Sequence, residues 1–271
     1  MNEKTYRLAL IGKDVSQSHS ERIHRFIFQA FGASLVYEKI SVSPADFDGM
    51  MTRLLGDFDG FNVTIPYKRD VLGYLNGVEG DALAFGAVNT VVCETRTGYN
   101  TDGVGFLRML EGENVCVTGK RVLVLGAGGA GRSTAVALKN AGAKVYLHRR
   151  NREELLETCR EIGVEAASSL TGYDVIVNAT GVGMHGTVGC SPVGAETFEG
   201  AEAAIDLIYR PRQTEFLRLA KSKGVKTVNG SAMLFYQAYY ADCYYLKKQP
   251  TVAESKTLYA QYQEVFGGEE T

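Results

Sequence analysis

A glycine-rich segment in the middle of the chain constrains the fold more than any other feature. Residues 121–132 read R-V-L-V-L-G-A-G-G-A-G-R, so that Gly126, Gly128 and Gly131 lie between a strand-like run and a helix-like segment. The first glycine permits a tight turn, the second lets the backbone approach a pyrophosphate, and the third allows close helix-on-strand packing. Free amides at the helix N-terminus attract the phosphates. The pattern predicts a dinucleotide-binding turn; the alternative is a glycine turn with a structural role only.

The rest of the chain alternates strand-like and helix-like segments. Glycine is abundant (31 of 271 residues) and proline scarce (5), which favours many tight strand-to-helix turns over a linker. A hydrophobic content of 45% and a charged content of 22% exclude wholesale disorder. We therefore expect an α/β fold with parallel neighbouring strands. The predicted strands are residues 6–11, 35–40, 60–64, 88–94, 121–125, 144–147, 174–178, 203–207 and 225–228, and the predicted helices are residues 20–31, 44–55, 128–140, 151–162 and 231–246.

The last predicted helix, residues 231–246, is apolar on almost all sides. A helix without a polar face is usually buried between other elements. We expect it to pack back on the first half of the chain and to make the first domain discontinuous. The predicted domains are residues 1–103 with 235–271, and residues 104–234.

Charge, hydropathy and cysteine usage exclude several classes of protein. The formal net charge of −2 does not favour a nucleic-acid-binding protein, and no apolar run reaches the 18 residues of a membrane span. The run of residues 8–12 is too short for a signal-peptide core. Five scattered cysteines without a C-x-x-C pair argue against a disulfide framework and against a zinc site. We expect a cytoplasmic protein without a bound metal, whose partner is a small molecule rather than a nucleic acid or a membrane.

The residues after the second strand of the dinucleotide-binding region bear on which nucleotide binds. NAD sites carry an Asp or Glu there, about 20 residues beyond the glycine turn, for the ribose 2′-hydroxyl. This chain has His148, Arg149 and Arg150 instead, and no carboxylate occurs before Glu153. Guanidinium groups at this place favour a 2′-phosphate and therefore NADP(H). The alternative is a solvated run of charge at the start of the next helix, with Asn151 or a neighbour as its N-cap.

Short polar motifs lie between the predicted elements of the first hundred residues. Ser18 and Ser20 occupy a strand-to-helix turn, and Thr64 and Lys68 follow a strand, where open α/β sheets bind ligands. Asn89 and the segment 100–103 (N-T-D-G) add an amide and a carboxylate in turn-rich contexts. Taken singly, each has a structural alternative, with Ser20 as a helix N-cap and the others as turn residues.

In this order the motifs resemble those of the shikimate dehydrogenase family. That family's pattern runs H-S-x-S-P, N-V-T-x-P-x-K, A-V-N-T, N-T-D-G, G-A-G-G-A, N-A-T-x-x-G-M, D-x-x-Y-x-P-x-x-T and G-x-x-M-L-x-x-Q. The matching segments here are residues 17–21, 62–68, 87–90, 100–103, 126–130, 178–184, 206–214 and 230–237. Departures include Gln17 for the family's His, Glu21 for its Pro, and His148-Arg149-Arg150 for the Asn-Arg-Thr of its cofactor loop. A tyrosine-rich helix also replaces the family's Gly- and Trp-containing one after Gln237.

The resemblance implies reversible NADP-dependent reduction of 3-dehydroshikimate to shikimate, a step of chorismate and aromatic amino-acid biosynthesis. It implies an N-terminal α/β substrate domain and a Rossmann-type dinucleotide-binding domain, in a monomer or homodimer. It assigns Lys68 and Asp102 as the catalytic pair. The implied substrate-binding residues are Ser18, Ser20, Thr64, Asn89, Tyr209 and Gln237. The implied cofactor-binding residues are Gly126, Ala127, Gly128, Gly129, Ala130, His148, Arg149, Arg150, Thr180 and Gly230.

The chemistry of these side chains suits the reduction of a ring ketone. The reaction needs a proton donor at the developing alkoxide, and Lys68 carries a proton and a positive charge together. Direct donation by Lys68 and a relay through Asp102, Lys68 and water both remain open from the sequence. Two other functions are also open. One is a quinate/shikimate dehydrogenase of broader substrate range, and the other is a non-catalytic shikimate- or quinate-sensing domain, which would not need Lys68 and Asp102.

Overall fold

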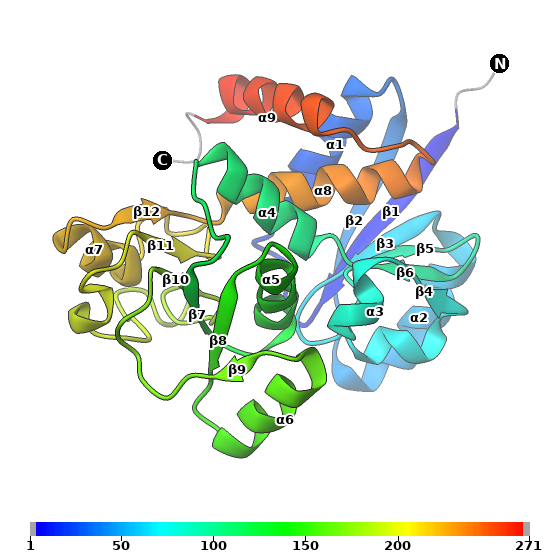
Figure 1. The fold of residues 1–271 in the computed structure, drawn as a ribbon. Helices are drawn as coiled ribbons and strands as arrows, with labels where there is room; N and C mark the ends of the chain where they lie inside the picture. The colour runs from blue at the N-terminus through cyan, green and yellow to red at the C-terminus, as the bar shows by residue number, and fades with distance from the viewer. Residues whose placement is uncertain (1–3, 268–271) are drawn as a thin grey trace. The chain divides into compact units, whose positions relative to one another are not determined.

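The computed structural model describes residues 4–267 and divides them into two compact units, each drawn in Figure 1. The first unit comprises residues 4–101 and 235–267, and the second comprises residues 102–234. Each unit has its own six-stranded sheet. The predicted α/β class is confirmed. The predicted return of the last part of the chain to the first unit is confirmed as well.

The sheet of the first unit is mixed. Its strands are β1 (Thr5–Gly12), β2 (Ser34–Ser41), β3 (Gly60–Val63), β4 (Gly77–Val78), β5 (Thr90–Val92) and β6 (Thr97–Tyr99), in the order β2-β1-β3-β5-β6-β4. β1 is parallel to β2 and β3, as predicted, but β5 is antiparallel to both of its neighbours. The expectation of parallel neighbours was wrong for β5. Its short connection to β6 can join only antiparallel strands, and β5 also runs opposite to β3.

The helices of the first unit come from both ends of the chain. They are α1 (Ser20–Ala30), α2 (Phe47–Asp57), α3 (Asp81–Phe85), α8 (Ser231–Tyr245) and α9 (Val252–Phe266), with short 3₁₀ segments at Pro44–Asp46 and Asp70–Tyr74. The sequence did not predict α9, because only Ser255, Leu258 and Tyr262 are buried along it, which leaves a narrow apolar stripe. The predicted burial of α8 is confirmed, with Phe235 and Tyr239 both fully inaccessible to solvent.

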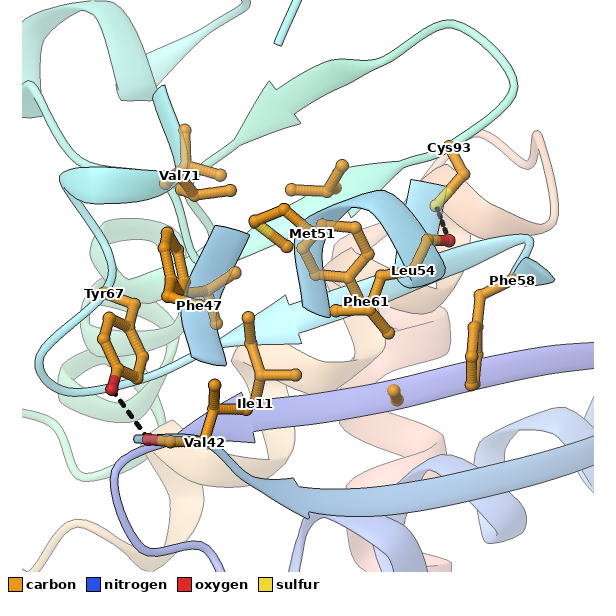
Figure 2. Close-up of a cluster of buried hydrophobic side chains, with 14 of the residues drawn as sticks. Ile11, Val42, Phe47, Met51, Leu54, Phe58, Phe61, Tyr67, Val71 and Cys93 are labelled. Carbon is orange, nitrogen blue, oxygen red and sulfur yellow. Dashed lines mark hydrogen bonds between the residues drawn. The ribbon is translucent and has the colours of Figure 1, made fainter. Parts of the chain in front are cut away.

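Successive residues of β1 are buried on opposite faces of the sheet, as the two-residue period of a strand requires. Ile11 faces the cluster formed with α2, where Phe47, Met51 and Leu54 pack against Phe61 of β3 (Figure 2). On the other face, Leu8 and Leu10 pack with Phe28 of α1 and with Ala241 and Tyr245 of α8. Helices α1 and α8 therefore share one core beneath the sheet.

The second unit is a parallel sheet. Its strands are β7 (Arg121–Leu125), β8 (Lys144–His148), β9 (Glu165–Ala166), β10 (Val175–Asn178), β11 (Ala203–Asp206) and β12 (Lys226–Val228), in the order β12-β11-β10-β7-β8-β9. Its helices are α4 (Asp102–Gly112), α5 (Gly129–Asn140), α6 (Arg152–Ile162) and α7 (Glu215–Ser222), with a 3₁₀ segment at Ala195–Phe198. The chain runs outward from β7 through β8 and returns to the other side of β7 at β10. Such a reversal is where open α/β sheets bind ligands.

Within the described residues, no helix combines the length and the apolarity that crossing a membrane would require.

Candidate functional site

The topology of the first sheet gathers its polar loops at one edge. β1 and β3 are parallel and end together, since Ile11 pairs with Val63. β5 begins at the same edge, where Thr90 pairs with Asn62, and β6 ends there, with Tyr99 opposite Thr90. The loops that follow β1 and β3, the segment before β5 and the segment after β6 therefore meet at this edge.

Backbone hydrogen bonds hold these loops to one another. The Thr64 amide donates to the Ile11 carbonyl at 2.8 Å, and the Val88 amide donates to the Lys68 carbonyl at 2.8 Å. Gly12 permits the close approach of the first two loops, because a Cβ there would lie 2.5 Å from Thr64 Cγ2. The peptide of Lys68 is thus fixed beside the segment that leads into Asn89, and the Lys68 side chain is half-buried.

The two serines form a compact local motif at the start of α1. Ser18 Oγ donates to Ser20 Oγ at 3.0 Å and accepts from the Ser20 amide at 3.2 Å. Lys39 Nζ of β2 donates to the carbonyl of Ser18 at 3.3 Å and to that of Ser16 at 2.9 Å. The structural alternative for Ser20 was wrong: the N-cap position is His19, and the buried Ser20 is the first helical residue, because Ser18 bonds its amide.

The side chain of Asn89 is buried and organises the end of β6. Its Oδ1 accepts from the Thr101 amide at 2.9 Å and from Thr90 Oγ1 at 2.9 Å. Its Nδ2 donates to Thr101 Oγ1 at 3.0 Å. Asn89 therefore fixes the conformation of Thr101, which directly precedes Asp102 in the chain.

The structure brings five of the predicted residues, Ser18, Ser20, Thr64, Lys68 and Asn89, to one sheet edge of the first unit. Three other predicted residues belong to other elements of the fold. Gln237 is half-buried on α8 of the same unit. Asp102 is the first residue of α4 and Tyr209 follows β11, and both belong to the second unit, where Asp102 is buried and Tyr209 half-buried.

Two buried residues behind this edge, Tyr37 and Asn62, had no role assigned to them from the sequence. Tyr37 of β2 donates from its hydroxyl to Asn62 Oδ1 at 3.1 Å. Asn62 Nδ2 in turn lies 3.3 Å from both the Asn89 carbonyl and Thr90 Oγ1, and donates to them. The available signal was a polar residue, Asn62, inside the otherwise apolar strand β3.

The glycine turn of the second unit has the geometry that its sequence predicts. Gly126 adopts a φ of +101°, which favours glycine. A Cβ on Gly131 would clash with the carbonyl of Gly126, so a glycine is needed where α5 packs on the turn. A Cβ on Gly128 would have no atom within 4 Å, and no side chain caps the N-terminus of α5 at Gly128. The open space and the uncapped amides fit a phosphate group. Beside this space, Ala127 is buried, and Gly129 and Ala130 are half-buried in the first turn of α5.

The charged loop after β8 caps the next helix, as one of the two interpretations of the sequence predicts. Asn151 caps α6, since its Oδ1 accepts from the Glu153 amide at 3.1 Å. Arg149 forms an ion pair with Glu154 of α6, whereas Arg150 is exposed. His148 is half-buried opposite Leu125 in the sheet, and this burial lowers its pKa, with a smaller contribution from the Arg152 charge.

Two of the sequence motifs form a buried network between β10 and β11. Asn178 Nδ2 donates to Asp206 Oδ1 at 3.1 Å, and Thr214 Oγ1 donates to Asp206 Oδ2 at 2.6 Å. Burial raises the pKa of Asp206, and these hydrogen bonds oppose the rise. Thr180 donates from its hydroxyl to Asn178 Oδ1 at 2.6 Å and is half-buried at the end of β10, beside the glycine turn.

Gly230 is buried, and a Cβ there would clash with the Leu207 carbonyl. Glycine at this position therefore allows the chain to pass close to the end of β11 before α8 begins. Among residues 4–267, no three His, Cys, Asp or Glu side chains are grouped as a metal site would require.

Known proteins are similar to this chain in sequence and in fold. The model of the shikimate dehydrogenase substrate binding domain matches residues 10–91. A Caldanaerobacter subterraneus subsp. tengcongensis protein named shikimate dehydrogenase (NADP(+)) is 38% identical over 257 residues, and the match covers 89% of this chain and 91% of that relative. The chain belongs to the shikimate dehydrogenase family. The resemblance seen in the eight sequence motifs is thereby confirmed.

Solved structures of the family agree in fold. The structure of shikimate 5-dehydrogenase from Thermus thermophilus in complex with NADP(H) and shikimate is 35% identical, with a TM-score of 0.85 over 94% of this chain and 99% of that one. The Listeria monocytogenes shikimate 5-dehydrogenase in complex with shikimate and NAD is 25% identical, with a TM-score of 0.80 over 95% of this chain and 98% of that one. These two family structures hold NADP(H) in one case and NAD in the other.

Proposed function

We propose that this protein is an NADP-dependent shikimate dehydrogenase that reversibly reduces 3-dehydroshikimate to shikimate in aromatic amino-acid biosynthesis. Membership of the family over most of the chain supports the reaction. The observation that carries it furthest in this chain is the meeting of Ser18, Ser20, Thr64, Lys68 and Asn89 at one sheet edge. Hydroxyl, amide and ammonium groups together suit a substrate that bears a carboxylate and several hydroxyls.

Residues 1–103 with 235–271 are assigned to substrate binding, and residues 104–234 to the cofactor. Ser18, Ser20, Thr64, Asn89 and Gln237 bind the substrate from the first domain, and Tyr209 does so from the second. Their hydroxyls and amides donate to the substrate carboxylate and exchange hydrogen bonds with its hydroxyl groups, so no buried cation is needed for the carboxylate. A hydrogen bond to a charged group contributes about 1.5–3 kcal/mol, so several of them orient the ring firmly.

Lys68 is the acid of the reduction and, with Asp102, the base of the oxidation. In the reducing direction its ammonium stabilises the developing negative charge on the ketone oxygen and donates the proton that converts it into a hydroxyl. In the oxidising direction the pair takes the hydroxyl proton, so oxidation is expected to be faster at higher pH. Asp102 is assigned as the carboxylate partner of Lys68 in these proton transfers.

The residues present fit NADP(H), because the turn offers open space at Gly128 beside uncapped amides. Residues 126–130 would hold the pyrophosphate, and Thr180 and Gly230 would line the same crevice. His148, Arg149 and Arg150 would hold the adenosine 2′-phosphate. When bound, the nicotinamide supplies the hydride for reduction and accepts it in oxidation.

The proposed function also bears on the cellular location and the oligomeric state of the protein. All five cysteines are free, as expected in the reducing environment of the cytoplasm, where we place the enzyme. We expect a monomer or a homodimer in solution, which light scattering after size exclusion would distinguish.

Steady-state rates of the purified protein test the proposal directly. The oxidation of shikimate and of quinate is measured with NADP⁺ and with NAD⁺, which gives four values of kcat/KM. The proposed function predicts the highest value for shikimate with NADP⁺. A comparable value for quinate would identify a quinate/shikimate dehydrogenase, and binding of either acid without any turnover would identify a sensing domain.

A further inference from the structure

A buried ionisable pair connects the two ends of the first unit. His24 Nδ1 of α1 lies 2.5 Å from Asp242 Oδ1 of α8, although the two residues are 218 positions apart in the chain. The side chains are 1% and 0% exposed, respectively. A buried charged pair is often no more stabilising than well-packed apolar side chains of similar volume. A contribution to stability alone is therefore a weak explanation for this pair, and its surroundings indicate a further role.

The imidazole of His24 is packed against a chain of hydrogen bonds that leads to the polar sheet edge. It stacks on the ring of Tyr37 with a centroid distance of 4.8 Å and an interplanar angle of 19°. The Tyr37 hydroxyl bonds Asn62, which bonds the carbonyl of Asn89 and the hydroxyl of Thr90. The His24 ring therefore packs against Tyr37, the residue whose hydroxyl holds Asn62 in place.

The same pair lies on the two helices that carry other predicted binding residues. His24 is four residues after Ser20 on α1, so the two side chains occupy one face of the helix, about one turn apart. Asp242 is five residues after Gln237 on α8. A bond between His24 and Asp242 therefore fixes the spacing of α1 and α8, and with it the positions of Ser20 and Gln237.

We propose that His24, Asp242 and Tyr37 form a positioning cluster for substrate binding in this enzyme. The cluster touches neither substrate nor cofactor; it holds Asn62, and through it the segment of Asn89, in the geometry that binds the substrate. This inference rests on the proposed function, because substrate affinity is its readout. It predicts that disturbing the cluster raises the KM for shikimate while kcat changes little.

The sharpest test removes one oxygen atom. Tyr37→Phe keeps the ring that stacks on His24 and deletes the hydroxyl that bonds Asn62. Loss of one such hydrogen bond predicts a rise of about fivefold in the KM for shikimate, with kcat changed less than about twofold. Tyr239→Phe is the matched control, because Tyr239 is another buried tyrosine of the first unit, and its hydroxyl bonds Thr251 and Glu254 instead. Its KM for shikimate is expected to remain that of the wild type.

Two substitutions of Asp242 add a rescue test. Asp242→Asn keeps a carbonyl oxygen that accepts from His24 Nδ1–H, and a KM near the wild-type value is expected. Asp242→Leu removes every acceptor and should raise the KM as Tyr37→Phe does. If Asp242→Leu does not fold, the KM values of Tyr37→Phe and Tyr239→Phe still test whether the cluster positions the substrate-binding residues.

The outcomes separate this inference from the proposed function. A wild-type protein that does not oxidise shikimate would overturn both. A wild-type protein that does so, with Tyr37→Phe indistinguishable in KM from wild type or from Tyr239→Phe, would overturn the positioning cluster alone. A Tyr37→Phe variant that loses kcat and retains KM would also contradict it.

Discussion

Replacing Asp242 by Asn should change how the stability of the protein depends on pH. Burial raises the pKa of the Asp242 carboxyl from its usual 3.8 to about 6, and the neighbouring His24 limits the rise. The other titratable groups near this carboxyl are Tyr37 of β2 and Cys243 and Tyr245 of α8. A raised pKa means that the folded protein binds the proton more tightly than the unfolded chain does.

The sign and the size of the effect follow from this shift. The stability that protonated Asp242 contributes is fully present below about pH 4 and is lost as the pH rises through 6. A shift of about two pKa units at 1.36 kcal/mol per unit corresponds to about 3 kcal/mol. Wild-type protein should therefore lose about 2–2.5 kcal/mol of this stabilisation between pH 4 and pH 7 relative to Asp242→Asn, which has no carboxyl to ionise.

Urea unfolding of both proteins at a series of pH values between 4 and 7.5 measures this difference. The chain has 15 tyrosines and no tryptophan, so tyrosine fluorescence and circular dichroism report unfolding. Asp57→Asn, which replaces an exposed aspartate of the same unit, controls for the loss of any one carboxylate. A constant difference between wild type and Asp242→Asn across this range would refute the reasoning, as would a difference that grows toward low pH.

Three further predictions concern the substrate and the cofactor. Ser18→Ala and Gln237→Ala should each raise the KM for shikimate by the loss of about 1–3 kcal/mol of binding free energy, with the affinity for NADPH unchanged in titrations. The double variant Arg149→Ala, Arg150→Ala should lower the preference for NADP⁺ over NAD⁺, measured as the ratio of kcat/KM values, at least about tenfold. Glu154→Gln should strengthen NADPH binding by up to about fivefold, because it frees Arg149 from an ion pair that is worth at most about 1 kcal/mol at an exposed site.

Each of these variants has a neighbour that serves as its control. Ser16→Ala lies in the same loop as Ser18 and should leave the KM unchanged. Arg160→Ala removes an exposed arginine from α6 and should leave the cofactor preference unchanged. An equal loss of shikimate and NADPH affinity in Ser18→Ala would show that the assignment of Ser18 to substrate binding is wrong. If the double arginine variant keeps the wild-type preference for NADP⁺ over NAD⁺, Arg149 and Arg150 do not carry that preference, and His148 and Arg152 become the next candidates.

The glycine turn could be predicted from sequence because each of its requirements is local. The positive φ of Gly126 and the tight packing of Gly131 depend on residues a few positions apart, so the strand–turn–helix pattern was sufficient. The N-cap of α6 at Asn151 could be predicted for the same reason. By contrast, Ser20 was misjudged as a possible N-cap, since the hydroxyl of Ser18 rather than its own decides how the helix begins.

The polar edge of the first sheet could be predicted only in part. Parallel strand ends gather Thr64 with the loop after β1, but Asn89 reaches the same edge only because β5 is antiparallel, which the alternating pattern did not indicate. The pair of His24 and Asp242 was beyond prediction from the residues. Nothing in the local sequence of either helix specifies a partner 218 positions away.

The role of Lys68 is the central chemical claim, and one kinetic comparison tests it most directly. Shikimate oxidation with NADP⁺ is measured for the wild type and for Lys68→Ala, with shikimate binding to both followed by calorimetry. A positioned acid and base contributes about 10²–10⁴-fold, so the variant should lose at least about a hundredfold in kcat while it still binds shikimate. A folded Lys68→Ala protein that keeps more than about a tenth of the wild-type kcat would contradict this role.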